Sequence, residues 1–174
     1  MDGNDNAVFF STGTVVRINK AVVDDLKDKA LASPDTTVRL CLHQSLDDAV
    51  QEMIIVHVRG TYVRPHRHDA ETESFLVLEG SMLVIFFDDN GKETDRLMMG
   101  EKDSGYSFVC RITPGQYHTM IPLSETVVFL ETTQGPFDRD AHNTFPSWAP
   151  GTDDILGAKQ FFASIGEGDY PLRQ

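Results

Sequence analysis

The segment 60–80, GTYVRPHRHDAETESFLVLEG, contains three side chains of metal-ligating type at close spacing, His66, His68 and Glu73. His66 and His68 are two positions apart, so on an extended segment both imidazoles would point to the same face. The acidic loop 69–71 would reverse the chain, and Glu73, which opens the next apolar run, would then reach the same point. Two imidazole nitrogens and one carboxylate oxygen form half of a shell that suits divalent first-row metals. The spacing therefore predicts a metal site.

His118 is the candidate for a fourth ligand. It follows the turn-forming residues 114–117, Pro-Gly-Gln-Tyr, which come after a short apolar-polar run, so a neighbouring strand would aim it inward. Three imidazoles and one carboxylate leave coordination positions open, whereas a closed structural zinc site has none. The donor set suits divalent Fe, Mn, Ni, Co and Zn alike. We expect a divalent metal whose open positions can bind a small molecule.

The fixed positions of this pattern resemble the two motifs of the cupin superfamily. The segment 60–80 matches the first motif, G-x5-H-x-H-x4-E-x6-G, and residues 114–118 resemble the core of the second, P-G-x-x-H. Pro122 stands where that motif often has an asparagine, but the asparagine is not a ligand in the family. The resemblance implies a jelly-roll β-barrel with His66, His68, Glu73 and His118 as metal ligands.

Further segments resemble the WbuC-like cupin metalloproteins, which some bacteria encode among their surface-polysaccharide genes. The resemblance covers roughly residues 15–150 and includes Arg39, His43, Gln51–Met53, Tyr62–His68, Gly135–Phe137 and Trp148–Pro150. It implies the cupin fold and the metal site, and it favours a sugar or sugar nucleotide as ligand, without defining a reaction.

Tyr62 and Arg64 are predicted to bind substrate. Both share strand parity with the two histidines, so a regular strand would point all four side chains into one cavity. A buried guanidinium needs an acidic partner or an anionic ligand. The acidic partner of Arg64 would be Glu79 or Glu131, and the alternative is a substrate contact with a part in catalysis.

Arg39 and His43 alternate on an earlier predicted strand and are further candidates for the site. We expect Arg39 to bind substrate and His43 to act in catalysis as a general acid or base, because the unperturbed pKa of histidine is close to working pH. His57 lies in an apolar run and is predicted to be a core or interface residue with its hydrogen bonds satisfied. His142 lies in a charged loop and is predicted to be solvated.

The composition limits the partners. The chain has 174 residues, of which 40% are hydrophobic and 24% charged, as is typical of one globular domain. Its net charge of −12 repels nucleic-acid backbones and anionic membrane surfaces. No apolar run approaches the ~18 residues of a membrane span, and the acidic start of the chain is unlike a secretory signal. With two cysteines and no CxxC motif, a cytoplasmic location is expected.

The predicted elements indicate an all-β fold, a cupin jelly-roll β-barrel with an N-terminal helix and a C-terminal loop and short helix. Within a single domain, 1–174, the N-terminal segment is 1–36, the barrel 37–134 and the extension 135–174. Asn19 is expected to cap a helix over 20–32, and Thr152 a short helix near the end. Turn signals separate about nine predicted strands, at 38–43, 52–59, 61–68, 74–78, 82–87, 94–99, 106–113, 118–122 and 126–131. Residues 8–18 are expected to form a further short strand or two.

These features predict a small metal-dependent enzyme acting on a small polar or anionic substrate. Isomerase, epimerase or lyase chemistry needs only a Lewis acid and an acid–base group, whereas a dioxygenase of a small organic acid needs a redox metal. A non-catalytic cupin that binds a small molecule is the other alternative. Because jelly rolls leave sheet edges open, a homodimer is expected, with the N-terminal segment as the exchanged arm.

Overall fold

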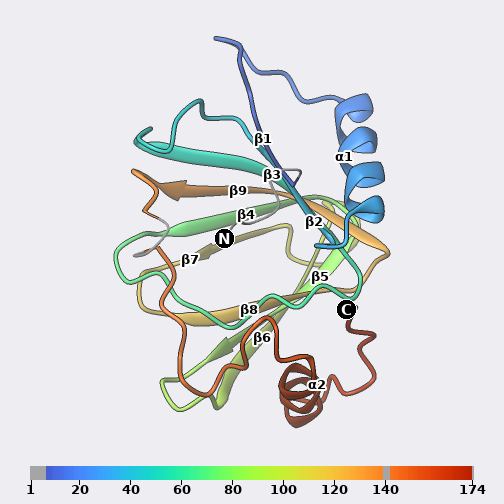
Figure 1. Ribbon diagram of the computed structural model, residues 1–174, viewed down its shortest axis with the longest axis vertical. Coiled ribbons are helices and arrows are strands. Elements are labelled where there is room, and N and C mark those ends of the chain that lie inside the picture. Colours follow the sequence, from blue (N-terminus) through green and yellow to red (C-terminus); the bar gives the residue numbers. More distant parts are fainter. Residues whose placement is uncertain (1–6, 139–141, 174) are drawn as a thin grey trace.

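The computed structural model describes residues 7–138 and 142–173 (Figure 1). These residues form nine strands and two helices. The strands are β1 (Val8–Phe10), β2 (Thr37–Cys41), β3 (Val50–Val58), β4 (Glu73–Glu79), β5 (Ser81–Phe87), β6 (Glu93–Gly100), β7 (Val109–Ile112), β8 (Tyr117–Pro122) and β9 (Thr126–Gln134), and the helices are α1 (Lys20–Ala32) and α2 (Ile155–Ser164).

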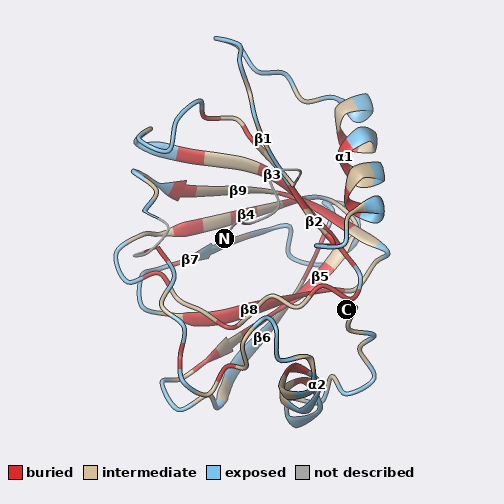
Figure 2. Cartoon of the chain, in the orientation of Figure 1, coloured by how far each residue is buried: buried red, intermediate tan, exposed pale blue. Residues whose placement is uncertain are grey.

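The strands lie in two facing sheets, in the orders β1-β2-β3-β9-β4-β7 and β6-β5-β8 (Figure 1). Neighbouring strands are antiparallel, except that β1 runs parallel to β2. Alternate side chains of both sheets point between them and form a hydrophobic core, which contains Ile55, Phe75, Val77, Met82, Val84, Met99, Ile112, Met120, Val127 and Phe129. Figure 2 shows buried residues concentrated along the inner strands. The predicted mostly β fold is therefore confirmed, in the form of two packed sheets.

Helix α1 covers part of the outer face of the larger sheet. Val23, Leu26 and Ala30 form its buried stripe, at the spacing of an amphipathic helix, and they pack against residues of β2, β3 and β9. The helix begins after Asn19, whose side chain accepts a hydrogen bond from the N–H of Val22 at 3.1 Å. Helix α1 thus spans the predicted residues and has the predicted cap.

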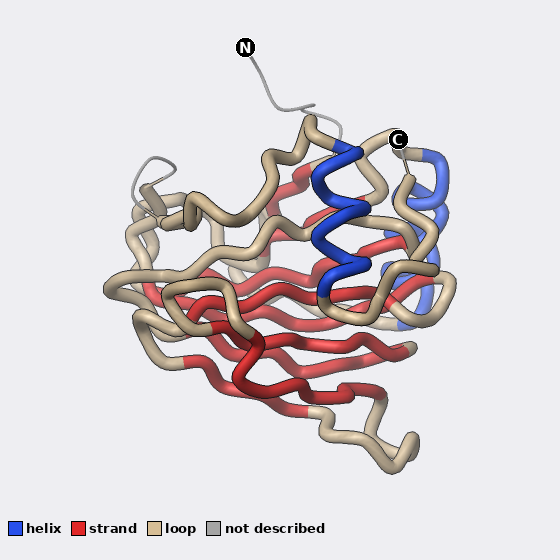
Figure 3. Tube along the Cα trace, turned by 90° about the horizontal axis from the view of Figure 1, so that it is seen from below, coloured by secondary structure: helices blue, strands red, loops and turns tan. Residues whose placement is uncertain are grey.

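Helix α2 packs on the outer face of the smaller sheet, where Phe162 is 1% exposed. Its N-cap is Asp154, which accepts from the N–H of Gly157 at 2.9 Å. The predicted cap at Thr152 is wrong, because a turn closed by the N–H of Asp154 and the carbonyl of Gly151 brings Asp154 to the helix start. Figure 3 shows both helices outside the stack of strands. Neither helix in the described ranges has the length and hydrophobicity to cross a membrane.

The segment that carries two of the predicted ligands is extended but lies in neither sheet. Residues 61–68, all of which the structure describes, contain no strand and make two isolated bridge pairings, His66 with His118 and Arg67 with Thr144. Pro65 cannot donate a backbone hydrogen bond, which interrupts any ladder at that point. The prediction of a regular strand over 61–68 is therefore wrong.

Candidate metal centre

Three elements bring the predicted ligands together. His66 and His68 lie on the extended segment before β4, Glu73 is the first residue of β4, and His118 lies on β8 of the opposite sheet. His66 and His118 exchange both backbone hydrogen bonds, at 3.0 and 2.9 Å, and the N–H of Gly115 donates to the carbonyl of His68 at 2.8 Å. These bonds hold the segment against β8 and its preceding turn, so the site lies between the two sheets.

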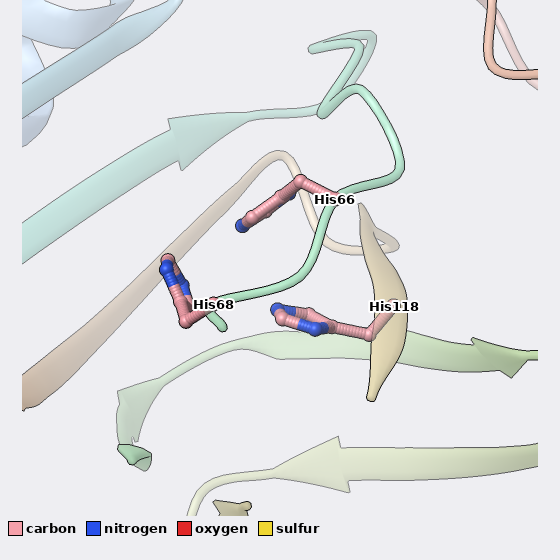
Figure 4. A group of neighbouring side chains, drawn as sticks. All are labelled: His66, His68 and His118. Carbon is pink, nitrogen blue, oxygen red and sulfur yellow. The ribbon is translucent and has the colours of Figure 1, made fainter. Parts of the chain in front are cut away.

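The four side chains converge. Figure 4 shows the rings of His66, His68 and His118 turned towards a common space, and a ring nitrogen of each lies within 4.8 Å of the other two. Oε2 of Glu73 lies 3.1 Å from Nε2 of His118 and 3.5 Å from Nε2 of His68. Ligands at metal–nitrogen distances of ~2.0–2.1 Å are spread over at most about 4.2 Å, so a slight contraction would place one ion among them.

Backbone carbonyls orient all three imidazoles. Nδ1 of His66 lies 2.9 Å from the carbonyl of Arg64, Nδ1 of His68 lies 2.8 Å from that of His142, and Nδ1 of His118 lies 3.1 Å from that of Gln116. A carbonyl only accepts hydrogen bonds, so each Nδ1 carries a hydrogen, and Nε2 is the nitrogen left for a metal, which would displace any proton that Nε2 carries. Metal-binding histidines are commonly oriented in this way.

The buried polar atoms of this cluster lack partners. Glu73 is 3% and His118 0% exposed, and Nε2 of His68, Nε2 of His118 and Oε2 of Glu73 have no hydrogen-bond partner among the described residues. Unsatisfied buried polar atoms are rare and costly in folded proteins. A divalent cation would satisfy all three atoms at once, so the donor set fits a metal ion.

Burial and mutual charge set the protonation of the cluster. Burial lowers the pKa of His66 to about 3, and the charge of His118 adds to this effect. Burial also disfavours the charged form of His68, but the carboxylate of Glu73 outweighs it and raises the pKa of His68 to about 9. Burial favours neutral Glu73, yet His118 and His68 hold its pKa below the usual range. Glu73 is therefore ionised, which is the form that binds a cation.

Tyr62 and Arg64 do not follow the histidines into the cluster. The hydroxyl of Tyr62 donates to the carbonyl of Pro150 at 3.0 Å, and its ring packs on Phe162, in the core beneath α2. Nη2 of Arg64 donates to the carbonyl of Ala149 at 3.1 Å. The alternation expected of a strand fails because residues 61–65, which the structure describes, are not in a strand. The placement of Tyr62 does not favour the predicted substrate contact.

Arg64 instead lies at the rim of the cluster. Its guanidinium carbon is 4.5 Å from the centroid of the Phe145 ring, which in turn lies 6.2 Å from the ring of His66. Of its two predicted acidic partners, Glu79 is bonded to Lys27 at 2.8 Å. Nε of Arg64 is buried with no hydrogen-bond partner in the part of the chain described. A donor is therefore left for another molecule.

The larger sheet places Arg39 and His43 to one side of the cluster. Arg39 is exposed on β2, which is separated from β4 by β3 and β9, a lateral distance of about 14 Å at the usual strand spacing. His43 follows β2, is 8% exposed, and its Nδ1 lies 3.1 Å from the backbone carbonyl of Glu52. Their substrate-binding and catalytic roles stay predictions. His57 is 5% exposed with Nδ1 2.8 Å from the hydroxyl of Thr37, as its predicted core role requires.

His142 is a residue that sequence reasoning placed wrongly. It was predicted to be solvated, but it is 7% exposed, and its ring lies 4.3 Å from that of His68 and 4.8 Å from that of Phe137. Paired backbone hydrogen bonds between Arg67 and Thr144, at 3.1 and 2.9 Å, hold this loop over the cluster. The neighbouring residues 139–141 lie outside the described ranges. No spacing in the sequence indicates such a contact.

Glu131 is a further acidic residue that the fold brings near the cluster. It lies on β9, opposite Phe75 of β4 and on the same inward-facing side as Glu73. Burial, together with the negative charge of Glu73, raises the pKa of Glu131 to about 8. The sequence suggested this glutamate only as a partner of Arg64.

The comparisons with known proteins agree with the fold. A family model described as a domain of unknown function (DUF6016) matches residues 18–99, and no curated protein matches the chain. The capsular polysaccharide assembling protein CapF from Staphylococcus aureus is 19% identical, with a TM-score of 0.50 over 63% of this chain and 29% of CapF. This chain therefore spans less than a third of CapF.

Two other solved structures are more distant. A recombinant oxalate oxidase in complex with glycolate is 15% identical, with a TM-score of 0.48 over 66% of this chain and 57% of its own. A cupin superfamily protein from Desulfitobacterium hafniense is 19% identical, with a TM-score of 0.44 over 56% of this chain and 76% of its own. The likeness to CapF is one of fold alone.

Proposed function

We propose that this protein is a cupin metalloprotein of the WbuC-like type, in which His66, His68, Glu73 and His118 bind a divalent first-row metal. The convergence of buried, unpartnered Nε2 and Oε2 atoms, from histidines oriented by backbone carbonyls, carries this proposal. When bound, the metal supplies a Lewis acid with open coordination positions.

The residues around the cluster favour a small polar or anionic substrate. Arg64 offers a half-buried guanidinium whose buried Nε is unpartnered among the described residues, and its charge is the kind that orients a carboxylate or phosphate. Phe145 forms an apolar surface between Arg64 and His66. In this arrangement Arg64 binds the anionic end of the substrate and Phe145 limits the access of water. The protein's own charge of −12 makes such a local cation necessary for an anionic ligand.

A sugar or sugar nucleotide of surface-polysaccharide biosynthesis is the substrate class that we favour. The resemblance to WbuC-like proteins motivates this choice, and the name of CapF, a capsular polysaccharide assembling protein, agrees with it. Both are analogies of family and fold, so the metal site, rather than the fold, must be tested first.

Metal content tests the proposal. Protein purified without oxygen should contain about one divalent first-row metal per chain by elemental analysis, and His68→Ala should lose it while the circular dichroism spectrum is kept. His43→Gln is the matched control, because it removes another buried histidine that lies outside the converging group. Equal metal content in wild type and His68→Ala would refute the ligand assignment. For protein that contains the metal, oxygen uptake in the presence of organic acids would indicate a dioxygenase, whereas Lewis-acid chemistry consumes no oxygen.

A further inference from the structure

A second group of ligand-type residues adjoins the first. One ligand atom each from His68, Glu71 and His142 lies within 4.8 Å of the other two. His142 is 7% exposed, and its Nδ1 is buried with no hydrogen-bond partner among the described residues. A buried imidazole nitrogen left unpaired beside a carboxylate is a group that a cation would satisfy.

The backbone holds this group in place. The carbonyl of His142 accepts from Nδ1 of His68 at 2.8 Å, so the main chain at residue 142 is tied to the first cluster. Two residues on, the hydroxyl of Thr144 donates to Oδ2 of Asp69 at 2.6 Å, which adds to the backbone pairing of Thr144 with Arg67. The ring of His142 therefore lies against His68 as a consequence of the loop's own hydrogen bonds.

The two groups share His68. Because Nδ1 of His68 is hydrogen-bonded to a carbonyl, only its Nε2 is free to bind a cation. Both groups therefore need the same atom, and one ion at a time can use it. An ion passing from one group to the other would keep His68 as a ligand while it exchanged Glu71 and His142 for Glu73 and His118.

The groups differ in their access to solvent. Glu71 is half-exposed, whereas Glu73 is 3% and His118 0% exposed. A hydrated cation attracted by the negative charge of the protein would therefore meet Glu71 before it met the inner residues. Stepwise replacement of water by ligands avoids the cost of moving a bare ion into a buried site.

We propose that Glu71, His68 and His142 form an outer cation position through which a divalent metal enters and leaves the inner site. This inference rests on the proposed metal site of His66, His68, Glu73 and His118. A step on the route to a site changes the rates of binding and release in the same proportion and leaves the equilibrium affinity unchanged. That signature distinguishes an entry position from a permanent ligand.

Stopped-flow binding of Co²⁺ to the chelator-treated protein tests the outer position, with the visible absorption of Co²⁺ as the readout. In Glu71→Gln and His142→Gln, binding and chelator-induced release should each slow by about tenfold, while Kd stays within about threefold. Glu101→Gln is the matched control, since it removes the same charge from an exposed loop. Glu71→Gln changes a half-exposed side chain, which keeps the test valid if His142→Gln disturbs the loop.

The possible outcomes separate the two proposals. If the wild type binds no Co²⁺, the metal site itself is refuted. If the wild type binds Co²⁺ but both variants match its rates, the outer position is wrong and the inner site stands. Faster release with an unchanged binding rate would make Glu71 and His142 permanent ligands, and simultaneous binding of two Co²⁺ ions would refute the sharing of His68. Either result overturns the entry role.

Discussion

Replacing Glu73 by glutamine is a sharp test of the metal centre. The side chain is buried with Oε2 3.1 Å from Nε2 of His118 and 3.5 Å from Nε2 of His68. Glutamine keeps the shape of the side chain but removes the negative charge that a cation needs. We therefore expect the variant to fold and to lose most of the stabilisation that metal gives the wild type.

The size of the effect follows from binding linkage. With free metal at about 100 times Kd, binding to the folded state adds about 2.7 kcal/mol to the free energy of unfolding. For a chain of this size each kcal/mol corresponds to about 2–4 °C, so Tm should rise by about 5–11 °C. If the substitution weakens binding by about 100-fold, the same metal concentration equals the variant's Kd. The gain is then RT ln 2, about 0.4 kcal/mol or about 1–2 °C.

Scanning calorimetry of metal-free protein with and without Zn²⁺ or Mn²⁺ measures this shift. Glu101→Gln serves as the control, because it removes an equal charge at an exposed position and should keep the full rise in Tm. A Glu73→Gln variant whose Tm rises as much as that of the wild type would refute the reasoning. So would a wild type whose Tm does not respond to any first-row divalent metal.

Three further predictions concern the fold that supports the site. Asn19→Ala should destabilise the protein by about 1 kcal/mol through loss of the α1 cap, and Asn19→Asp should not; urea unfolding measures both. Phe162→Ala should cost about 3–5 kcal/mol, because the ring is 1% exposed on the buried face of α2; an unchanged urea midpoint would contradict this packing. Burial, aided by the charge of Arg39, lowers the pKa of His57 to about 3, so the folded state keeps it neutral. In the unfolded chain His57 binds a proton below about pH 6.5. The free energy of unfolding should therefore fall as the pH drops below that value, by up to about 1.4 kcal/mol per pH unit. His57→Gln should reduce the fall between pH 7 and 5, and equal falls in both proteins would disprove the assignment.

The local elements were the most predictable part of the fold. Helix α1 depends on an N-cap and an apolar stripe that are both local in sequence, and the structure has them where they were predicted. The hairpin between β5 and β6 likewise depends on a local feature, because Gly91, in the connection formed by residues 88–92, has a positive φ of 81° that glycine adopts readily. Such signals need no information from distant residues.

The errors arose where distant contacts override local pattern. Strand parity placed Tyr62 and Arg64 with the histidines, but Pro65 interrupts the segment and the loop at residues 149–150 binds both side chains from outside. His142 was predicted to be solvated from its charged neighbours, yet backbone pairing between residues 67 and 144 buries it. Neither contact is visible from residue spacing.

By itself, the sequence determined which four residues are the candidate ligands, because their spacing and chemical types are local properties of two short segments. Only the tertiary structure decided which ring nitrogens face the common space, since that depends on the carbonyls that hold each Nδ1. It also decided that Glu71 and His142 adjoin His68. The physical reason is that burial and hydrogen-bond geometry arise from segments far apart in the chain, and they exist only once the two sheets and the crossing loop have packed together.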